Sequence, residues 1–250
     1  MSSWVESASA SFECRHSSEC SADAAQVLKS LEHTRERLDR WFPRTVGELT
    51  VVLHDSVASL TLTNPLLALV WLATARTGRR YLTGWVGRRE LHVLAPAALR
   101  ARSSELPGSY EMLALAPASL YTRRVIAECD HELRHSRIRG RGGPELRWAW
   151  LLEGAARWFS GETAHAGAAI RERLRDARRP AFPPSIRDAP LLGGTLIDLL
   201  VSREGELAAA QLAARRHPGG SRAALAKAFA GRSLGTVESD WRAHLAKLAQ

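Results

Sequence analysis

The sequence predicts an α+β protein, with a mixed sheet and helices in its N-terminal part and helices alone in its C-terminal half. Short segments with strand character, at residues 50–54, 81–85 and 90–94, all lie in the first hundred residues. From residue 118 onward, apolar residues recur at helical spacing. Strands first and helices afterwards is the element order typical of α+β folds.

The N-terminal part begins with residues 1–20, which we expect to be irregular. In the segment from Ser21 to Trp41, apolar residues such as Leu28 and Leu31 lie near one stripe, which predicts an amphipathic helix that Pro43 ends. Residues 56–76 favour helix with an interruption at Pro65. The strands 81–85 and 90–94 are joined by a turn at residues 87–89, and Pro96 ends the second.

The C-terminal part begins with a predicted helix over residues 118–138, followed by a glycine-rich turn at 139–144. Pro144 suits the first position of the next helix, and Gly161 is a suitable stop. Residues 194–250 are expected to form three or four amphipathic helices. This organisation predicts an N-terminal α/β lobe over 21–138 and a helical C-terminal lobe over 139–250.

The composition is that of a globular protein: 45% of the 250 residues are hydrophobic and 24% are charged. The formal net charge is +9, from 35 lysines and arginines against 26 acidic residues. Such a charge suits nucleic acid or another anionic partner, or simply a solvated basic surface. Because the arginines are spread along the chain without interleaved aromatic residues, we do not expect a nucleic-acid partner.

The chain shows no targeting signal or membrane span. The first twenty residues lack a basic segment followed by an apolar core, so no signal peptide is indicated. The longest apolar run, residues 65–75, is too short to cross a bilayer. Three cysteines without a CxxC pair argue against a disulfide framework. We therefore expect a cytoplasmic protein without a membrane partner.

Residues 131–135 read His-Glu-Leu-Arg-His, and this motif is the strongest indication of a catalytic site in the sequence. On a helix, His131 and His135 lie on one face and can both reach one zinc ion at about 2.0–2.1 Å. Glu132 is rotated by about 100° from His131, so its carboxylate can accept a proton from a water held by the metal. The alternative is a pair of surface histidines on a polar helix.

Glu153 is the candidate third ligand. Catalytic zinc takes three protein ligands and leaves one position for water, and His2Glu is a known set. Glu153 lies in the apolar segment 148–159, where an unpaired carboxylate would be costly to bury. Zinc coordination would remove that cost, and so would an ion pair with an arginine such as Arg157, which leaves both interpretations open.

The HELRH motif followed by WLLEGAARWFSG resembles the gluzincin clan of zinc metallopeptidases, particularly the bacterial peptidase MA-like domains. The resemblance implies a thermolysin-like (zincin) architecture, a Zn2+ cofactor held by His131, His135 and Glu153, and Glu132 as general base. It also implies a peptide or protein substrate, bound as an added strand along the sheet's edge strand, for which we expect residues 90–94.

The chain departs from that family at several positions. Many gluzincins use a downstream tyrosine or histidine to stabilise the oxyanion, but every tyrosine here is upstream of the motif, and His165 is the candidate substitute. Arg157 stands where thermolysin-like enzymes place an acid. Glu128 and Asp198 are alternative acceptors for a zinc histidine. These departures keep two alternatives open: a catalytically inactive binding or structural module, and, less favoured, a basic nucleic-acid-binding protein.

Overall fold

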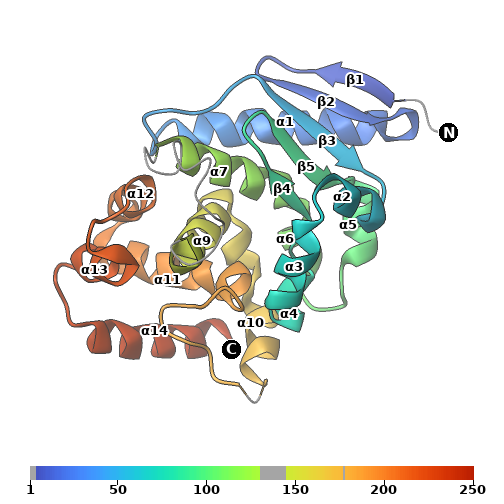
Figure 1. The fold of residues 1–250 in the computed structure, drawn as a ribbon. Helices are drawn as coiled ribbons and strands as arrows, with labels where there is room; N and C mark the ends of the chain where they lie inside the picture. Colours follow the sequence, from blue (N-terminus) through green and yellow to red (C-terminus); the bar gives the residue numbers. More distant parts are fainter. Residues whose placement is uncertain (1–3, 130–144, 177) are drawn as a thin grey trace.

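The computed structural model describes residues 4–129, 145–176 and 178–250 and shows a five-stranded mixed sheet next to a mostly helical C-terminal half (Figure 1). The strands are β1 (Trp4–Ala8), β2 (Phe12–Ser17), β3 (Leu49–His54), β4 (Gly84–Val86) and β5 (Glu90–Leu94). The helices of the N-terminal half are α1 (Ser21–Leu38), α2 (Val57–Thr63), α3 (Leu66–Ala73), α4 (Arg76–Arg79), α5 (Pro96–Arg102), α6 (Ser109–Ala114) and α7 (Ala116–Cys129). The helices of the C-terminal half are α9 (Ala149–Ser160), α10 (Gly167–Leu174), α11 (Ala189–Glu204), α12 (Glu206–Ala214), α13 (Gly220–Ala228) and α14 (Leu234–Leu248). Three short 3-10 turns, η1 (Ser18–Cys20), η2 (Glu145–Trp148) and η3 (Glu162–His165), complete the described elements.

The α+β class predicted from the sequence is confirmed, and the sheet has the order β1-β2-β3-β5-β4. β2, β3 and β5 run parallel, while β1 and β4 pair antiparallel with their neighbours. The parallel strands are connected by crossovers through α1 and through the α2–α4 segment, as parallel pairing requires.

The expectation that residues 1–20 are irregular was wrong, because β1 and β2 form an antiparallel hairpin in this segment. In β2, Phe12 and Cys14 are buried while Glu13 and Arg15 are exposed. This alternation has the strand period of two, but charged residues on the exposed face conceal it in the sequence. An ion pair of 3.0 Å between Arg15 Nε and Glu6 Oε1 joins the two strands on that face.

The expectation that residues 90–94 form the edge strand was also wrong. β5 pairs with β3 on one side and with β4 on the other, so β4 is the edge at this end of the sheet. Four consecutive side chains of β5, from Leu91 to Leu94, are buried, as expected for a strand covered on both faces. The edge strand is three residues long, and its Gly84 lies so close to His92 that a side chain there would overlap the His92 carbonyl.

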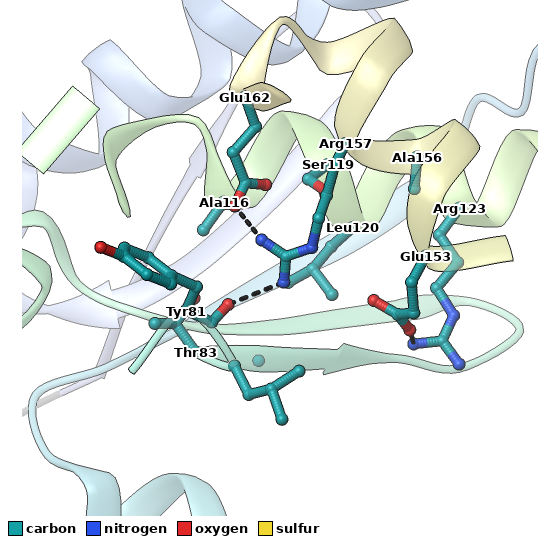
Figure 2. A pocket seen from close by; sticks show the side chains of 12 residues that line it. Tyr81, Thr83, Ala116, Ser119, Leu120, Arg123, Glu153, Ala156, Arg157 and Glu162 are labelled. Atoms are coloured by element: carbon teal, nitrogen blue, oxygen red, sulfur yellow. Dashed lines mark hydrogen bonds and ion pairs between the residues drawn. The ribbon is translucent and has the colours of Figure 1, made fainter. Parts of the chain in front are cut away.

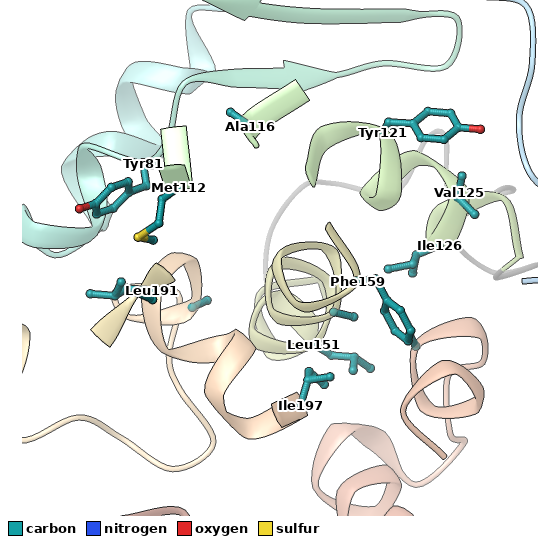
Figure 3. Packing of buried hydrophobic residues seen from close by; sticks show 14 of the residues in the cluster. Tyr81, Met112, Ala116, Tyr121, Val125, Ile126, Leu151, Phe159, Leu191 and Ile197 are labelled. Atoms are coloured by element: carbon teal, nitrogen blue, oxygen red, sulfur yellow. The ribbon is translucent and has the colours of Figure 1, made fainter. Parts of the chain in front are cut away.

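The helices α1 and α7 cover one face of the sheet, and α2 covers the other (Figure 1). The core continues from the sheet into the helical half, through α7, α9 and α11. Figure 3 shows this junction, where Ile126 of α7 lies beside Phe159 of α9, and Ile197 of α11 lies beside Leu151 of α9. No helix in the described part of the chain combines the length and apolar character needed to cross a membrane.

Two glycines bring α9 and α11 into backbone contact. A Cβ atom at Gly154 would overlap the carbonyl group of Gly193, and a Cβ atom at Gly193 would lie 2.6 Å from the Trp150 carbonyl oxygen. Side chains at either position would force the two helices apart, so the close approach requires glycine at both. This contact fixes the rotation of α9 about its axis, and with it the direction in which Glu153 points.

A buried pair of histidines connects β3 and β5 on the face of the sheet covered by α2. His54 Nε2 lies 3.0 Å from His92 Nδ1, and His54 Nδ1 lies 2.9 Å from Ser59 Oγ of α2. Burial lowers the pKa of His54 to about 4, and His92 adds to this effect while Asp55 opposes it. The pair is therefore held together by neutral imidazoles.

The α9–α11 contact can be tested with Gly154→Ala. Alanine would normally stabilise a helix interior by up to about 1 kcal/mol relative to glycine. At this position we expect the opposite, a loss of more than about 2 kcal/mol in the free energy of unfolding, because the new methyl group overlaps Gly193. Gly235→Ala in α14, where the nearest atom to a new Cβ is 3.9 Å away, is the matched control and should be neutral or stabilising. Chemical denaturation measures the free energy of unfolding of both variants. Equal changes in the two would contradict the close contact between α9 and α11.

The histidine pair predicts a pH dependence of stability. Between pH 6.5, the ordinary pKa of histidine, and about 4, the unfolded chain binds a proton at His54 that the folded chain does not. The free energy of unfolding should therefore fall as the pH is lowered through this window. Denaturation at several pH values should show a shallower loss in His54→Gln than in the wild type, whereas replacing the exposed His33 by Gln should leave the slope unchanged. Parallel slopes for His54→Gln and the wild type would contradict this account.

Candidate functional site

Of the four candidate site residues, the structure describes Glu153. His131, Glu132 and His135 fall in residues 130–144, which lie outside the described part of the chain. The described elements on either side of that segment are α7, which ends at Cys129, and η2, which begins at Glu145. The site is therefore built from what α7, α9 and β4 place around Glu153.

Glu153 is positioned by α9, whose apolar residues Trp150, Leu151 and Phe159 are buried. The helix ends at Gly161, which adopts a left-handed conformation with φ 88°, as glycine does readily after a helix. The expectation of a helix through this segment that stops at Gly161 is confirmed. α9 packs against α7 on one side and α11 on the other, so its polar side chains have few directions open to them.

The Glu153 carboxylate is paired with Arg123 of α7. Arg123 NH1 donates a hydrogen bond of 2.5 Å to Glu153 Oε1. The Glu153 side chain is only 16% exposed, while that of Arg123 is 41% exposed. Within the described residues, Oε2 of Glu153 accepts no hydrogen bond, so one carboxylate oxygen is available to a further ligand.

A small pocket of about 30 Å³, with room for one or two water molecules, contains Glu153 (Figure 2). Its walls come from three parts of the fold: the segment leading into the edge strand β4, the first half of α7, and α9 with the turn that follows it. The lining residues are Tyr81, Leu82, Thr83, Gly84, Ala116, Ser119, Leu120, Arg123, Glu153, Ala156, Arg157 and Glu162. An edge strand and a buried carboxylate therefore share one pocket.

Arg157, the arginine considered as a partner for Glu153, makes other contacts. It is buried, its NH1 forms an ion pair with Glu162, and its NH2 donates a hydrogen bond of 3.0 Å to the carbonyl oxygen of Tyr81 (Figure 2). Burial lowers the pKa of Arg157, and the nearby Glu153 opposes that shift. The ion-pair interpretation of Glu153 is thus realised by Arg123, and Arg157 instead ties α9 to the segment before the edge strand.

Sequence reasoning missed Arg123 and Glu162. Arg123 lies thirty positions before Glu153, and no spacing rule connects two helices across that interval. Glu162 lies five residues after Arg157 in the turn η3, beyond the helix in which pairs at i+4 are expected.

The candidate auxiliary residues lie elsewhere or are already engaged. Trp158 Nε1 donates a hydrogen bond of 2.9 Å to Asp198 Oδ1, and His244 Nε2 lies 2.9 Å from Asp198 Oδ2. The bond with His244 is the main cause of a lowered pKa at Asp198. Glu128 pairs with Arg124 at 2.8 Å. His165 is exposed and is not among the residues that line the pocket.

The tyrosines offer no hydroxyl to this pocket in the described structure. Tyr81 lines it, but its hydroxyl donates to Ser109 Oγ at 3.4 Å. The Tyr121 hydroxyl donates to the Val46 carbonyl oxygen at 2.7 Å, and burial raises its pKa. The guanidinium of Arg123 is therefore the partly exposed donor nearest to Glu153 among the described residues.

Within residues 4–129, 145–176 and 178–250, no three histidine, cysteine, aspartate or glutamate side chains come together as a metal site. Of the three proposed zinc ligands, only Glu153 belongs to these residues. Glu153, the described member of the proposed ligand set, suits zinc. It presents a largely buried carboxylate with one unengaged oxygen at the wall of a pocket. Arg123, bound to the other oxygen, would compete with a bound cation for the negative charge of this carboxylate.

Comparisons of the chain with models of known protein families, with curated proteins and with solved structures find no match.

The competition for Glu153 can be tested by removing its present partner. In Arg123→Met the carboxylate loses its ion pair, so Zn2+ should bind more tightly than in the wild type if Glu153 is a ligand. Without zinc the variant should be less stable than the wild type, because the largely buried Glu153 carboxylate is left without its counter-charge. Arg124→Met is the matched control, since Arg124 pairs with Glu128 and not with Glu153. Titration calorimetry with Zn2+ gives the affinities, and an unchanged affinity in Arg123→Met would contradict a ligand role for Glu153.

Proposed function

We propose that this protein is a zinc metallopeptidase in which His131, His135 and Glu153 hold the metal and Glu132 is the general base. The observation that carries the proposal is the place of Glu153: a largely buried carboxylate, with one oxygen unengaged by described residues, in a pocket beside the edge strand of the sheet. The HELRH motif at the end of the predicted helix that begins as α7 supplies the rest of the ligand set.

Zinc, when bound, polarises the scissile carbonyl and lowers the pKa of a water molecule towards about 7. Glu132 accepts the proton of that water and passes it to the leaving amine, which is the work of a general base that then acts as an acid. Arg123, which is 41% exposed and lines the same pocket, is the candidate donor to the negative charge that develops on the carbonyl oxygen.

The edge strand β4 is the proposed binding place for an extended peptide, in a thermolysin-like arrangement. Within the described sheet β4 pairs on one side only, so the backbone of its outer side can pair with a substrate strand. The residues just before it, from Tyr81 to Thr83, line the same pocket as Glu153. A peptide added to this edge would run past the carboxylate.

A specific observation also favours a second candidate, a peptidase-like module without activity. Arg123 occupies the carboxylate that zinc needs, and the described tyrosine hydroxyls are engaged elsewhere. In such a module the Arg123–Glu153 ion pair would replace the metal as the link between α7 and α9. Metal content separates the two candidates.

The proposal predicts that protein purified without chelators contains zinc, that Glu132→Gln retains the zinc but loses proteolysis, and that His135→Ala loses the zinc. Elemental analysis measures the metal, and a library of quenched fluorescent peptides measures hydrolysis. Glu206→Gln, which removes an exposed carboxylate on α12 away from the pocket, is the matched control and should keep both properties. Wild-type protein that neither contains nor takes up zinc would overturn the metallopeptidase proposal in favour of the inactive module.

A further inference from the structure

The chain segment that connects β3 to β4 exposes an unusual amount of apolar surface. No charged residue occurs from Ser56 to Ala75, a stretch that contains α2 and α3. Eight large hydrophobic side chains are exposed in the described part of the chain, and five of them belong to this segment: Leu62, Leu66, Leu69, Val70 and Leu72. We call these five residues the apolar patch.

The patch is not the outer face of an ordinary amphipathic helix. Leu62, Leu69 and Leu72 are 83%, 60% and 72% exposed, and Leu67 is the only residue of α3 that is buried. At about 100° per residue, the four exposed large side chains of α3 (Leu66, Leu69, Val70 and Leu72) span about 160° of its circumference. A helix that is apolar over so wide an arc is normally buried in a protein or in lipid.

Arginines gather beside the patch, on α4 and at the end of α5. The Arg102 guanidinium lies 5.7 Å from the ring centre of Trp71 in α3 and donates hydrogen bonds to the carbonyl oxygens of Arg79 and Arg80. Arg76 is exposed three residues after the end of α3. Arg76, Arg79, Arg80 and Arg102 form no ion pair with a carboxylate in the described part of the chain.

These four arginines, which form no ion pair with a described carboxylate, indicate what kind of partner suits the patch. A symmetric contact between two copies would place the same surface on both subunits, and so bring one arginine cluster towards the other. A membrane with anionic headgroups suits both the apolar patch and the arginines. Its acyl region accepts apolar side chains from any direction, and its headgroups attract arginine.

We propose that α2 and α3 form a membrane-surface contact, with the apolar patch inserted among lipid chains and Arg76, Arg79, Arg80 and Arg102 at the level of anionic headgroups. The short length of residues 65–75 excludes a span, but lying on a membrane surface needs no span. The inference is independent of the metallopeptidase proposal, since none of the patch residues lines the Glu153 pocket.

Flotation of the full chain with vesicles tests the inference. The protein should float with vesicles of phosphatidylcholine mixed with phosphatidylglycerol, and much less with vesicles of phosphatidylcholine alone. The double variant Leu69→Ser/Leu72→Ser should bind the mixed vesicles more than about tenfold more weakly, because two inserted side chains are lost. Arg76→Gln should weaken binding about fivefold, and added salt should have the same effect.

Matched controls come from exposed residues elsewhere in the fold. Leu207→Ser removes a leucine that is 62% exposed on α12, and Arg222→Gln removes an exposed arginine on α13; both should bind like the wild type. Since Leu69 and Leu72 are exposed, their replacement should leave the thermal unfolding temperature unchanged, which confirms that the variant is folded. Absence of vesicle binding, binding unaffected by the double variant, or a dimer in solution that the double variant dissociates would each overturn the proposal.

Discussion

The backbone contact between Gly154 of α9 and Gly193 of α11 is the constraint from which the geometry of the pocket follows. A helix packed on two sides can present a polar side chain only in the remaining directions, and here a shift of α9 is blocked by the backbone itself. Gly154, the neighbour of Glu153, therefore determines the direction in which the carboxylate points. The Arg157 contacts with Glu162 and the Tyr81 carbonyl then fix α9 relative to the segment before the edge strand.

The electrostatics of the pocket follow from that position. Glu153 is too buried to remain unpaired, and Arg123 of α7 supplies its counter-charge in the described structure. A divalent cation would supply the same counter-charge more strongly, so metal and arginine are alternative partners for one carboxylate. In the proposed metallopeptidase this ion pair is the resting state of a metal ligand, whereas in the inactive module it stands in place of the metal.

The sequence was sufficient for the class of the fold and for the helix that carries Glu153, because helical periodicity and terminal glycine are local signals. It was insufficient for the β1–β2 hairpin, whose alternation is concealed by charged residues on the exposed face. It also could not place the edge strand, since the order of β4 and β5 depends on which of them pairs with β3. The partner of Glu153 could not be predicted from the sequence for the same reason, because Arg123 and Glu153 meet only where α7 and α9 pack together.

The Glu153 carboxylate is where the two interpretations of this protein differ most directly, and diffraction from crystals soaked with Zn2+, recorded at the zinc absorption edge, can observe it. The account predicts an anomalous peak about 2.0–2.2 Å from a carboxylate oxygen of Glu153, with the imidazoles of His131 and His135 as its other protein ligands. A structure in which Glu153 stays paired with Arg123 while zinc is absent, or is bound elsewhere, would contradict it.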